Sequence, residues 1–209
     1  MNTFARRGAP FLWAFLGVVL LLGAFYFDAP VHSWMRDHQS PAVTPVMEAA
    51  SRWGDWPPHV AVALIAAVLA YFAGSRQWLA IFLALVLACA VAGTVNRAIK
   101  IAAGRARPSV TMDPGWHGLK FSSKYTAFPS GHTAATTAFF GALLFARWRV
   151  GLALLPIPFL IATSRVYLGA HHLSDVVAGA IVGTISGFFV WRFVHRRLQR
   201  GAAGEAAAA

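Results

Sequence analysis

The sequence predicts an all-α fold, that of a polytopic membrane protein with six transmembrane helices. The 209 residues are 58% hydrophobic and only 12% charged, and the mean hydropathy is +0.59. A soluble domain of this length carries about 25% charged residues. Asp, Glu, Lys and Arg are absent from four long runs, 8–27, 56–75, 77–96 and 125–146, and from two shorter ones, 150–164 and 176–191. A helix needs roughly 20 apolar residues to cross the hydrocarbon core, so all six runs predict spans if the short ones include one charged residue near an end.

The expected helices lie near residues 11–27, 57–74, 78–99, 131–147, 150–168 and 174–193. The first run could instead belong to a cleaved signal peptide, because MNTFARR is a basic N-terminal region. Its apolar stretch from Phe11 to Phe27 is longer than the usual apolar region of about 7–15 residues, and no clean small-residue cleavage site follows it. We therefore expect a retained first span.

Basic residues flank the predicted spans on alternate connections. They are Arg6 and Arg7 before the first helix, Arg76 between the second and third, Arg147 and Arg149 between the fourth and fifth, and Arg192, Arg196, Arg197 and Arg200 after the sixth. Because cytoplasmic loops carry an excess of Lys and Arg, this pattern places both termini in the cytoplasm. The net charge of +11 is thereby accounted for in part by topology, and we expect no nucleic-acid partner.

Three connections then face outward, at 28–56, 100–130 and 169–173. In the first, the segment PVMEAASRW predicts a short interfacial helix with Met47 and Trp53 on its apolar side. We see one six-helix domain over residues 1–200 and a low-complexity tail over 201–209 that is expected to be disordered. The oligomeric state cannot be read from the sequence.

The outward connections hold more basic residues than the excess of Lys and Arg in cytoplasmic loops explains. The residues concerned are Lys100, Arg105, Arg107, Lys120, Lys124 and Arg165. Lys120 and Lys124 could extend to lipid phosphates, as long basic side chains near helix ends do. Arg165 lies inside the end of a span, where arginine usually faces the bundle interior and marks function. Converging Arg and Lys side chains predict an anionic, phosphorylated ligand, and hence a site at the outer helix ends.

The segments FPSGH (128–132) and SRVYLGAHHLSD (164–175) bring further polar groups to that level. Ser130 can cap the fourth helix, Gly131 lets the backbone approach a ligand, and the free N–H groups of a helix start bind anions. His171 and Asp175 are four residues apart and can share a face, where a carboxylate would fix the tautomer of the imidazole. No cluster has the spacing of a dedicated metal site, so no metal and no cofactor is expected. These arguments leave open which imidazole would be a nucleophile.

Three motifs resemble the type 2 phosphatidic acid phosphatase family, within the wider superfamily that includes the vanadium haloperoxidases. The family motifs KxxxxxxRP, PSGH and SRxxxxxHxxxD are matched by KIAAGRARP at 100–108, PSGH at 129–132 and SRVYLGAHHLSD at 164–175. The order and the internal spacing agree without a gap. The motifs cover 100–175, and the six-helix plan extends the likeness over nearly the whole chain.

The resemblance implies a role for each matching residue. Lys100, Arg107 and Arg165 would hold the phosphate oxygens, with Ser130 and the N–H of Gly131. His171 would attack phosphorus and form a phosphohistidine, Asp175 would orient it, and His132 would protonate the leaving oxygen. The spacing of the motif selects His171 rather than its neighbour His172.

The function implied is that of a metal-independent lipid phosphatase in the cytoplasmic (inner) membrane of a bacterium, with an extracytoplasmic active site. Undecaprenyl diphosphate and phosphatidylglycerophosphate are the favoured substrates, and phosphatidic acid and the lipid A phosphates are alternatives. A lipid phosphotransferase would use the same site. A non-enzymatic lipid-binding or transport protein would not need the His171–Asp175 pair. A haloperoxidase would share the anion pocket, but the six spans argue against that soluble class.

Overall fold

The computed structural model describes residues 3–208, with side chains described for 11–201. Over the described residues the regular structure is helical, apart from one isolated bridge between Arg105 and Trp116. The helices are α1 (Thr3–Tyr26), α2 (Asp28–Asp37), α3 (Thr44–Trp53), α4 (Trp56–Phe72), α5 (Arg76–Ala103), α6 (Gly131–Ala146), α7 (Trp148–Leu154), α8 (Pro156–Tyr167) and α9 (Leu173–Ala208), with a 3₁₀ turn at Ser123–Tyr125. The predicted all-α class is confirmed.

Each of the six predicted helices has a counterpart, with two differences. The helix expected near 150–168 is divided into α7 and α8, because Pro156 at the start of α8 cannot continue the hydrogen-bond ladder of α7. The expected 28–56 loop holds two helices: the predicted interfacial helix is α3, and α2 was not foreseen. α1 meets α2 at a 56° bend, and α3 meets α4 at a 57° bend.

Three helical segments of the described chain are long and apolar enough to cross a membrane, and the two bent pairs raise this to at most five. α6 is shorter, with 16 residues, or about 24 Å at ~1.5 Å per residue, against a hydrocarbon core of ~30 Å. The structure therefore supports a membrane protein with three to five candidate spans. The sixth span stays a prediction.

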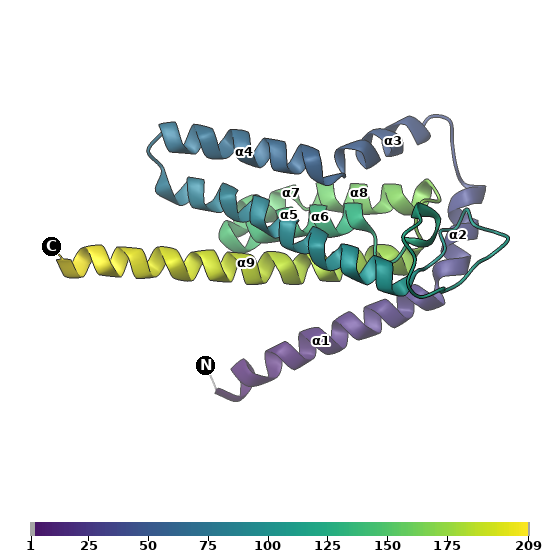
Figure 1. Cartoon of the computed structure of the whole chain (residues 1–209), viewed down its shortest axis with the longest axis horizontal. Coiled ribbons are helices and arrows are strands. Elements are labelled where there is room, and N and C mark those ends of the chain that lie inside the picture. Colours follow the sequence, from purple (N-terminus) through teal and green to yellow (C-terminus); the bar gives the residue numbers. More distant parts are fainter. Residues whose placement is uncertain (1–2, 209) are drawn as a thin grey trace.

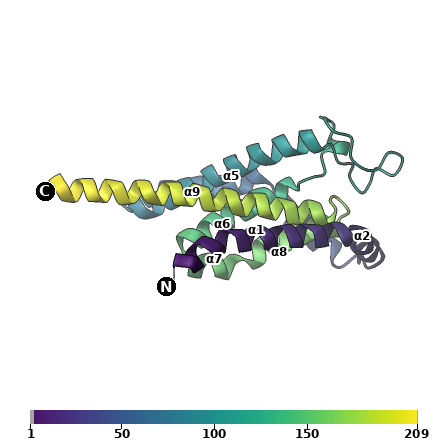
Figure 2. The same ribbon diagram turned by 90° about the horizontal axis from the view of Figure 1, so that it is seen from below.

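Small residues let the central helices pack closely. α9 packs against both α5 and α6, and it runs along the length of the molecule in Figures 1 and 2. Gly179, Gly183 and Gly187 form one face of α9, where an added Cβ would collide with the backbone of α6. Interfaces of this kind, rich in glycine and alanine, are typical of helices packed in a membrane. The buried core lies between α4, α5, α6 and α9 and includes Ile81, Leu85, Phe139 and Phe140.

The two ends of the bundle differ in content. The start of α1 and the end of α9 lie at one end, whereas α2, the long 104–130 connection and the turn from α8 to α9 lie at the other (Figure 1). α9 is helical to Ala208, through most of the segment whose composition predicts disorder, and residue 209 lies outside the described residues. The domain boundary at residue 200 and the disordered tail stay predictions.

Candidate active site

The three sequence motifs meet at the end of the bundle opposite the termini. Lys100 lies in the last turn of α5, which ends at Gly104 in the left-handed conformation (φ 58°), and Arg107 follows in the loop. Ser130 precedes α6, and His132 lies in its first turn. The remaining predicted residues lie in the last turn of α8, in the turn that follows it and in the first turn of α9: Arg165, His171 and Asp175.

Three cations of this region form no ion pair with any carboxylate of the described side chains. Lys100 Nζ donates to the carbonyl oxygens of Thr126 (2.6 Å) and Ala127 (3.4 Å). Arg107 donates to the carbonyl oxygens of Ser123 (2.8 Å) and Ala170 (3.3 Å). Arg165 donates to the hydroxyl of Ser51, and its buried Nε has no partner among the described residues.

These three side chains are also close enough for their positive charges to repel one another. Like charges held together in a partly buried place are costly, and a bound anion removes that cost. The arrangement therefore fits a phosphate group better than it fits an apolar ligand. His132 is close enough to the same three cations for their charges to act on its imidazole ring.

His171 and Asp175 form a buried pair. His171 is 2% exposed and Asp175 is fully buried, and His171 Nδ1 lies 3.4 Å from Asp175 Oδ2. The angles fall short of a hydrogen bond, and Nδ1 has no other partner in the described chain. Burial lowers the pKa of His171 to about 3; the charges of Lys100 and Arg107 add to this, while the Asp175 carboxylate opposes it. The imidazole is thus neutral at physiological pH, with Nε2 turned away from the carboxylate.

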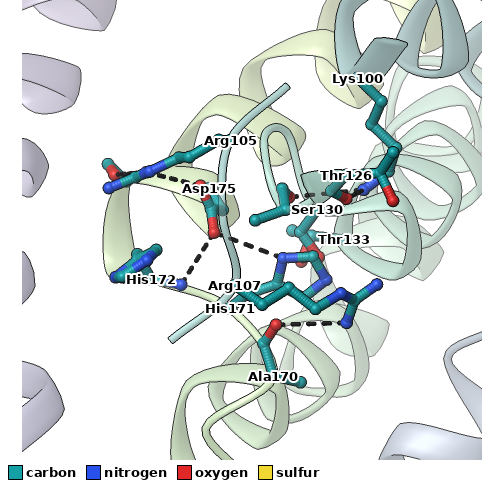
Figure 3. A network of polar contacts seen from close by, with 12 residues as sticks. Lys100, Arg105, Arg107, Thr126, Ser130, Thr133, Ala170, His171, His172 and Asp175 are labelled. Carbon is teal, nitrogen blue, oxygen red and sulfur yellow. Dashed lines mark hydrogen bonds and ion pairs between the residues drawn. The ribbon is translucent and has the colours of Figure 1, made fainter. Parts of the chain in front are cut away.

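The backbone of the PSGH segment is held by α9. Ser130 N donates to the Asp175 carbonyl oxygen (2.8 Å), so the start of α6 is fixed to the start of α9. Ser130 occupies the predicted cap position, but its side chain makes no capping bond; it accepts instead from Thr133 Oγ1 (3.1 Å). Gly131 lies close to Lys100 Cε, since an added Cβ there would be 3.7 Å away. Figure 3 shows Lys100, Ser130 and the His171–Asp175 pair around one region.

Within the described residues, no three His, Cys, Asp or Glu side chains gather where they could hold a metal ion. A hollow of about 280 Å³ lies beside α3 and is lined by Glu48, Ser51, Arg52 and Leu168. Because Ser51 also accepts the bond from Arg165, this hollow adjoins the cation cluster. Ser130 and Asp175 are covered by protein in this structure.

The profile of the PAP2 superfamily matches residues 79–199, which is more than half of the chain. The chain belongs to the PAP2 superfamily. A lipid A 1-phosphatase of Rhizobium johnstonii is 42% identical over 96 residues, covering 44% of this chain and 38% of the relative. A decaprenylphosphoryl-5-phosphoribose phosphatase of Mycolicibacterium smegmatis is 32% identical over 146 residues, covering 66% of this chain and 72% of the relative. The match to the lipid A phosphatase thus spans about two fifths of that relative's length.

A solved structure has the same fold. The PAP2-type phosphatidylglycerolphosphate phosphatase of Bacillus subtilis superposes with a TM-score of 0.70 at 20% identity, over 90% of this chain and 97% of that one. Because the PAP2 profile begins at residue 79, this coverage means that the similarity also includes most of the chain before that residue.

Sequence reasoning missed Asp28 and Ser51 at this candidate site, and it counted Arg105 among the basic residues without its role as an ion-pair partner. Arg105 pairs with Asp175, Asp28 pairs with Arg105, and Ser51 holds Arg165. One signal was available: Asp28 directly follows the first charge-free run, on a connection that was predicted to face the same side as the excess of basic residues. Ser51 offered no such signal, because a serine in a polar connection is ordinary.

Proposed function

We propose that this PAP2 chain is an integral membrane phosphatase that removes phosphate from a phosphorylated lipid through a phosphohistidine on His171. One observation carries the proposal: the buried His171–Asp175 pair lies beside three cations that form no ion pair with a carboxylate among the described residues. A binding protein would need the cations, but it would gain nothing from the His171–Asp175 pair. The cations would serve a phosphoryl transfer by stabilising its developing negative charge.

In the first step, the lone pair of His171 Nε2 attacks phosphorus, and the bond from phosphorus to the leaving oxygen breaks. Asp175 stabilises the positive charge that develops on the ring and holds Nδ1. His132 gives a proton to the leaving oxygen. Lys100, Arg107 and Arg165 neutralise the three equatorial oxygens, with help from Ser130 and the Gly131 N–H.

In the second step, water attacks the phosphohistidine, the P–N bond breaks, and His171 regains its lone pair. His132 takes the proton that it gave in the first step back from the water, so the enzyme returns to its starting state. Inorganic phosphate leaves. No metal ion is needed in this scheme, because the cationic side chains carry the electrostatic work.

We place the chain in the cytoplasmic (inner) membrane of a bacterium, with six spans, cytoplasmic termini and the site on the outer side. The support is that the site lies at the end of the bundle opposite the start of α1 and the end of α9 (Figure 1), whereas Arg147 and Arg149 lie where α6 meets α7 and the basic residues of 192–200 lie in the last part of α9. α6 can be shorter than a lone span because α5 and α9 enclose it.

For the substrate we favour undecaprenyl diphosphate or phosphatidylglycerophosphate, the second being the lipid after which the Bacillus subtilis phosphatase with the same fold is named. A lipid A phosphate is the second candidate, and the 42% identity to a lipid A 1-phosphatase over the motif region supports it. A phosphotransferase would share the first step and replace water with an acceptor lipid.

Phosphate release tests these alternatives directly. The full chain in detergent, with EDTA present, is offered each of the three lipids named above and phosphatidic acid, and inorganic phosphate is measured. His171→Ala should release none, whereas the matched His172→Ala variant should retain activity. Equal release by wild type and His171→Ala would overturn the proposal, and phosphate transfer to added lipid without release would identify a transferase.

A further inference from the structure

A buried polar cluster joins the start of α2 to the His171–Asp175 pair. Asp28 lies at the junction of α1 and α2, outside the stretch matched by the PAP2 profile, and its side chain is 12% exposed. It accepts three hydrogen bonds: from Ser174 N (2.8 Å), from Ser174 Oγ (2.6 Å) and from Arg105 Nη2 (2.7 Å). Such a buried carboxylate is fully partnered, as buried charges must be.

Arg105 connects this carboxylate to the catalytic one. Its Nη1 donates to Asp175 Oδ1 (2.6 Å) and to Ser174 Oγ (2.6 Å), while Nη2 donates to Asp28. The guanidinium also lies over the rings of Phe25 (5.3 Å to the centroid) and Trp116 (4.9 Å). The planar fork of an arginine suits such bridging, and the two rings restrict its movement.

The two carboxylate oxygens of Asp175 therefore contact different partners. Oδ1 accepts from Arg105, and Oδ2 accepts from the His172 N–H (2.9 Å) while it faces His171 Nδ1. Figure 3 shows Asp175 at the centre of these three contacts. Rotation of the carboxylate away from His171 would break the bond to Arg105, so Arg105 fixes the plane in which Oδ2 meets the imidazole.

We propose that Asp28 and Arg105 are positioning residues, a clamp that holds Asp175 in register with His171 and ties the pair to the α1–α2 bend. Arg105 differs from the three cations proposed to bind phosphate, because it forms ion pairs with two carboxylates. Among the described side chains, those three cations form no ion pair with a carboxylate. The inference rests on the proposed function. It assigns catalytic relevance to the α1–α2 bend, which lies far from the three motifs in sequence.

The clamp predicts a specific change in kinetics. Loss of a hydrogen bond to a charged group lowers kcat about 10- to 100-fold in Arg105→Gln. KM and the inhibition constant of inorganic phosphate should stay within about twofold of wild type, since the phosphate-binding cations are untouched and uniform binding is separate from transition-state stabilisation.

The pH profile should also move. The charged or titratable groups around His171 are Asp175 from α9, Lys100 from α5, Arg107 from the loop and, through Asp175, Arg105 and His172. Without Arg105 the Asp175 charge acts on the imidazole alone, which favours its protonated form. The acid limb of kcat/KM in Arg105→Gln should therefore shift to higher pH. Arg105→Lys keeps the charge, so its acid limb should lie at the wild-type pH while its rate stays below that of the wild type.

The experiment compares Arg105→Gln, Arg105→Lys and Asp28→Asn with Asp37→Asn, a control in the same helix whose carboxylate is 58% exposed. Each full-length variant is measured for kcat, KM, phosphate inhibition and pH profile after a check of its unfolding temperature. A lowered kcat with unchanged phosphate inhibition, and a shifted limb only in Arg105→Gln, supports the clamp. If the wild type is active and Arg105→Gln and Asp28→Asn have the same kcat as Asp37→Asn, the clamp is overturned. A variant that loses kcat and phosphate binding in parallel overturns it as well. A wild type that releases no phosphate from any lipid overturns the proposed function instead.

Discussion

Gly183 is the glycine of α9 at which an added Cβ would meet atoms of α6 at the shortest distance, and its replacement tests the packing that sets the site. In Gly183→Ala the added Cβ would collide with Thr137 Oγ1 and the Ala134 carbonyl oxygen, and it would lie 2.8 Å from Ala138 N. Two of these three atoms are backbone, so they cannot move aside without a shift of the helix. α6 and α9 must separate by a few tenths of an ångström or more.

The magnitude follows from the cost of overpacking, which is about 1–3 kcal/mol. For a chain of this size that lowers the unfolding temperature by roughly 2–12 °C. Activity should fall as well, because α6 carries His132 and α9 carries Asp175, and small displacements of reacting groups are costly. Alanine is the better helix former, so a stabilisation of about 0.5–1 kcal/mol is expected where space permits.

Gly93→Ala is the matched control, since a Cβ at Gly93 on α5 meets no atom within 4 Å. Both variants are purified in one detergent, and the unfolding temperature and lipid phosphate release are measured together. Gly93→Ala should equal or exceed the wild type in stability and match it in rate. If Gly183→Ala unfolds at the same temperature as Gly93→Ala and keeps full activity, α6 and α9 do not approach each other in this way.

The other predictions concern chemistry and topology. His132→Ala should lose about 10²- to 10⁴-fold in rate on a lipid monophosphate and less on an isoprenyl diphosphate, whose leaving phosphate needs no proton; equal losses on both would remove His132 as the acid. Burial lowers the pKa of His171 to about 3, and the imidazole must be neutral to attack, so activity is retained below the ordinary histidine pKa and lost only as pH falls towards that value. The measurement is kcat/KM against pH, corrected for ionisation of the substrate, and an acid limb near the ordinary histidine pKa of about 6.5 would contradict it. A cysteine in place of Thr111 should react with a membrane-impermeant reagent on intact cells, and labelling only after lysis would reverse the topology.

The sequence could predict the helices because their signal is local. Charge-free runs located α5 and α6 to within four residues at each end, and motif spacing brought Lys100, Ser130 and Asp175 to one end of the bundle. The break at Pro156 was visible in principle, but hydropathy averages over a proline. α2 was not foreseen because its sequence, DAPVHSWMRD, is polar and short.

The supporting contacts could not be predicted, because they join residues far apart in the chain. Arg105 meets Asp28 across 77 positions, and Ser51 meets Arg165 across 114. Sequence spacing reports neighbours on one helix, whereas these pairs depend on how α2 packs against α8 and α9 and α3 packs against α8. Arg105 was counted among the basic residues predicted to face outward, yet its two ion pairs separate it from the three cations proposed to bind phosphate.

The phosphohistidine is the centre of the proposed mechanism, and its direct detection is the decisive measurement. The full chain is mixed with a lipid labelled at the reacting phosphorus with ³²P, quenched in alkali within one turnover and digested for peptide mapping. We predict label on His171 that is stable to alkali and lost in acid, present in Asp28→Asn at a lower rate of formation and absent from His171→Ala. Label on His172, or product formed in a single turnover with no labelled protein at any time, would contradict the account.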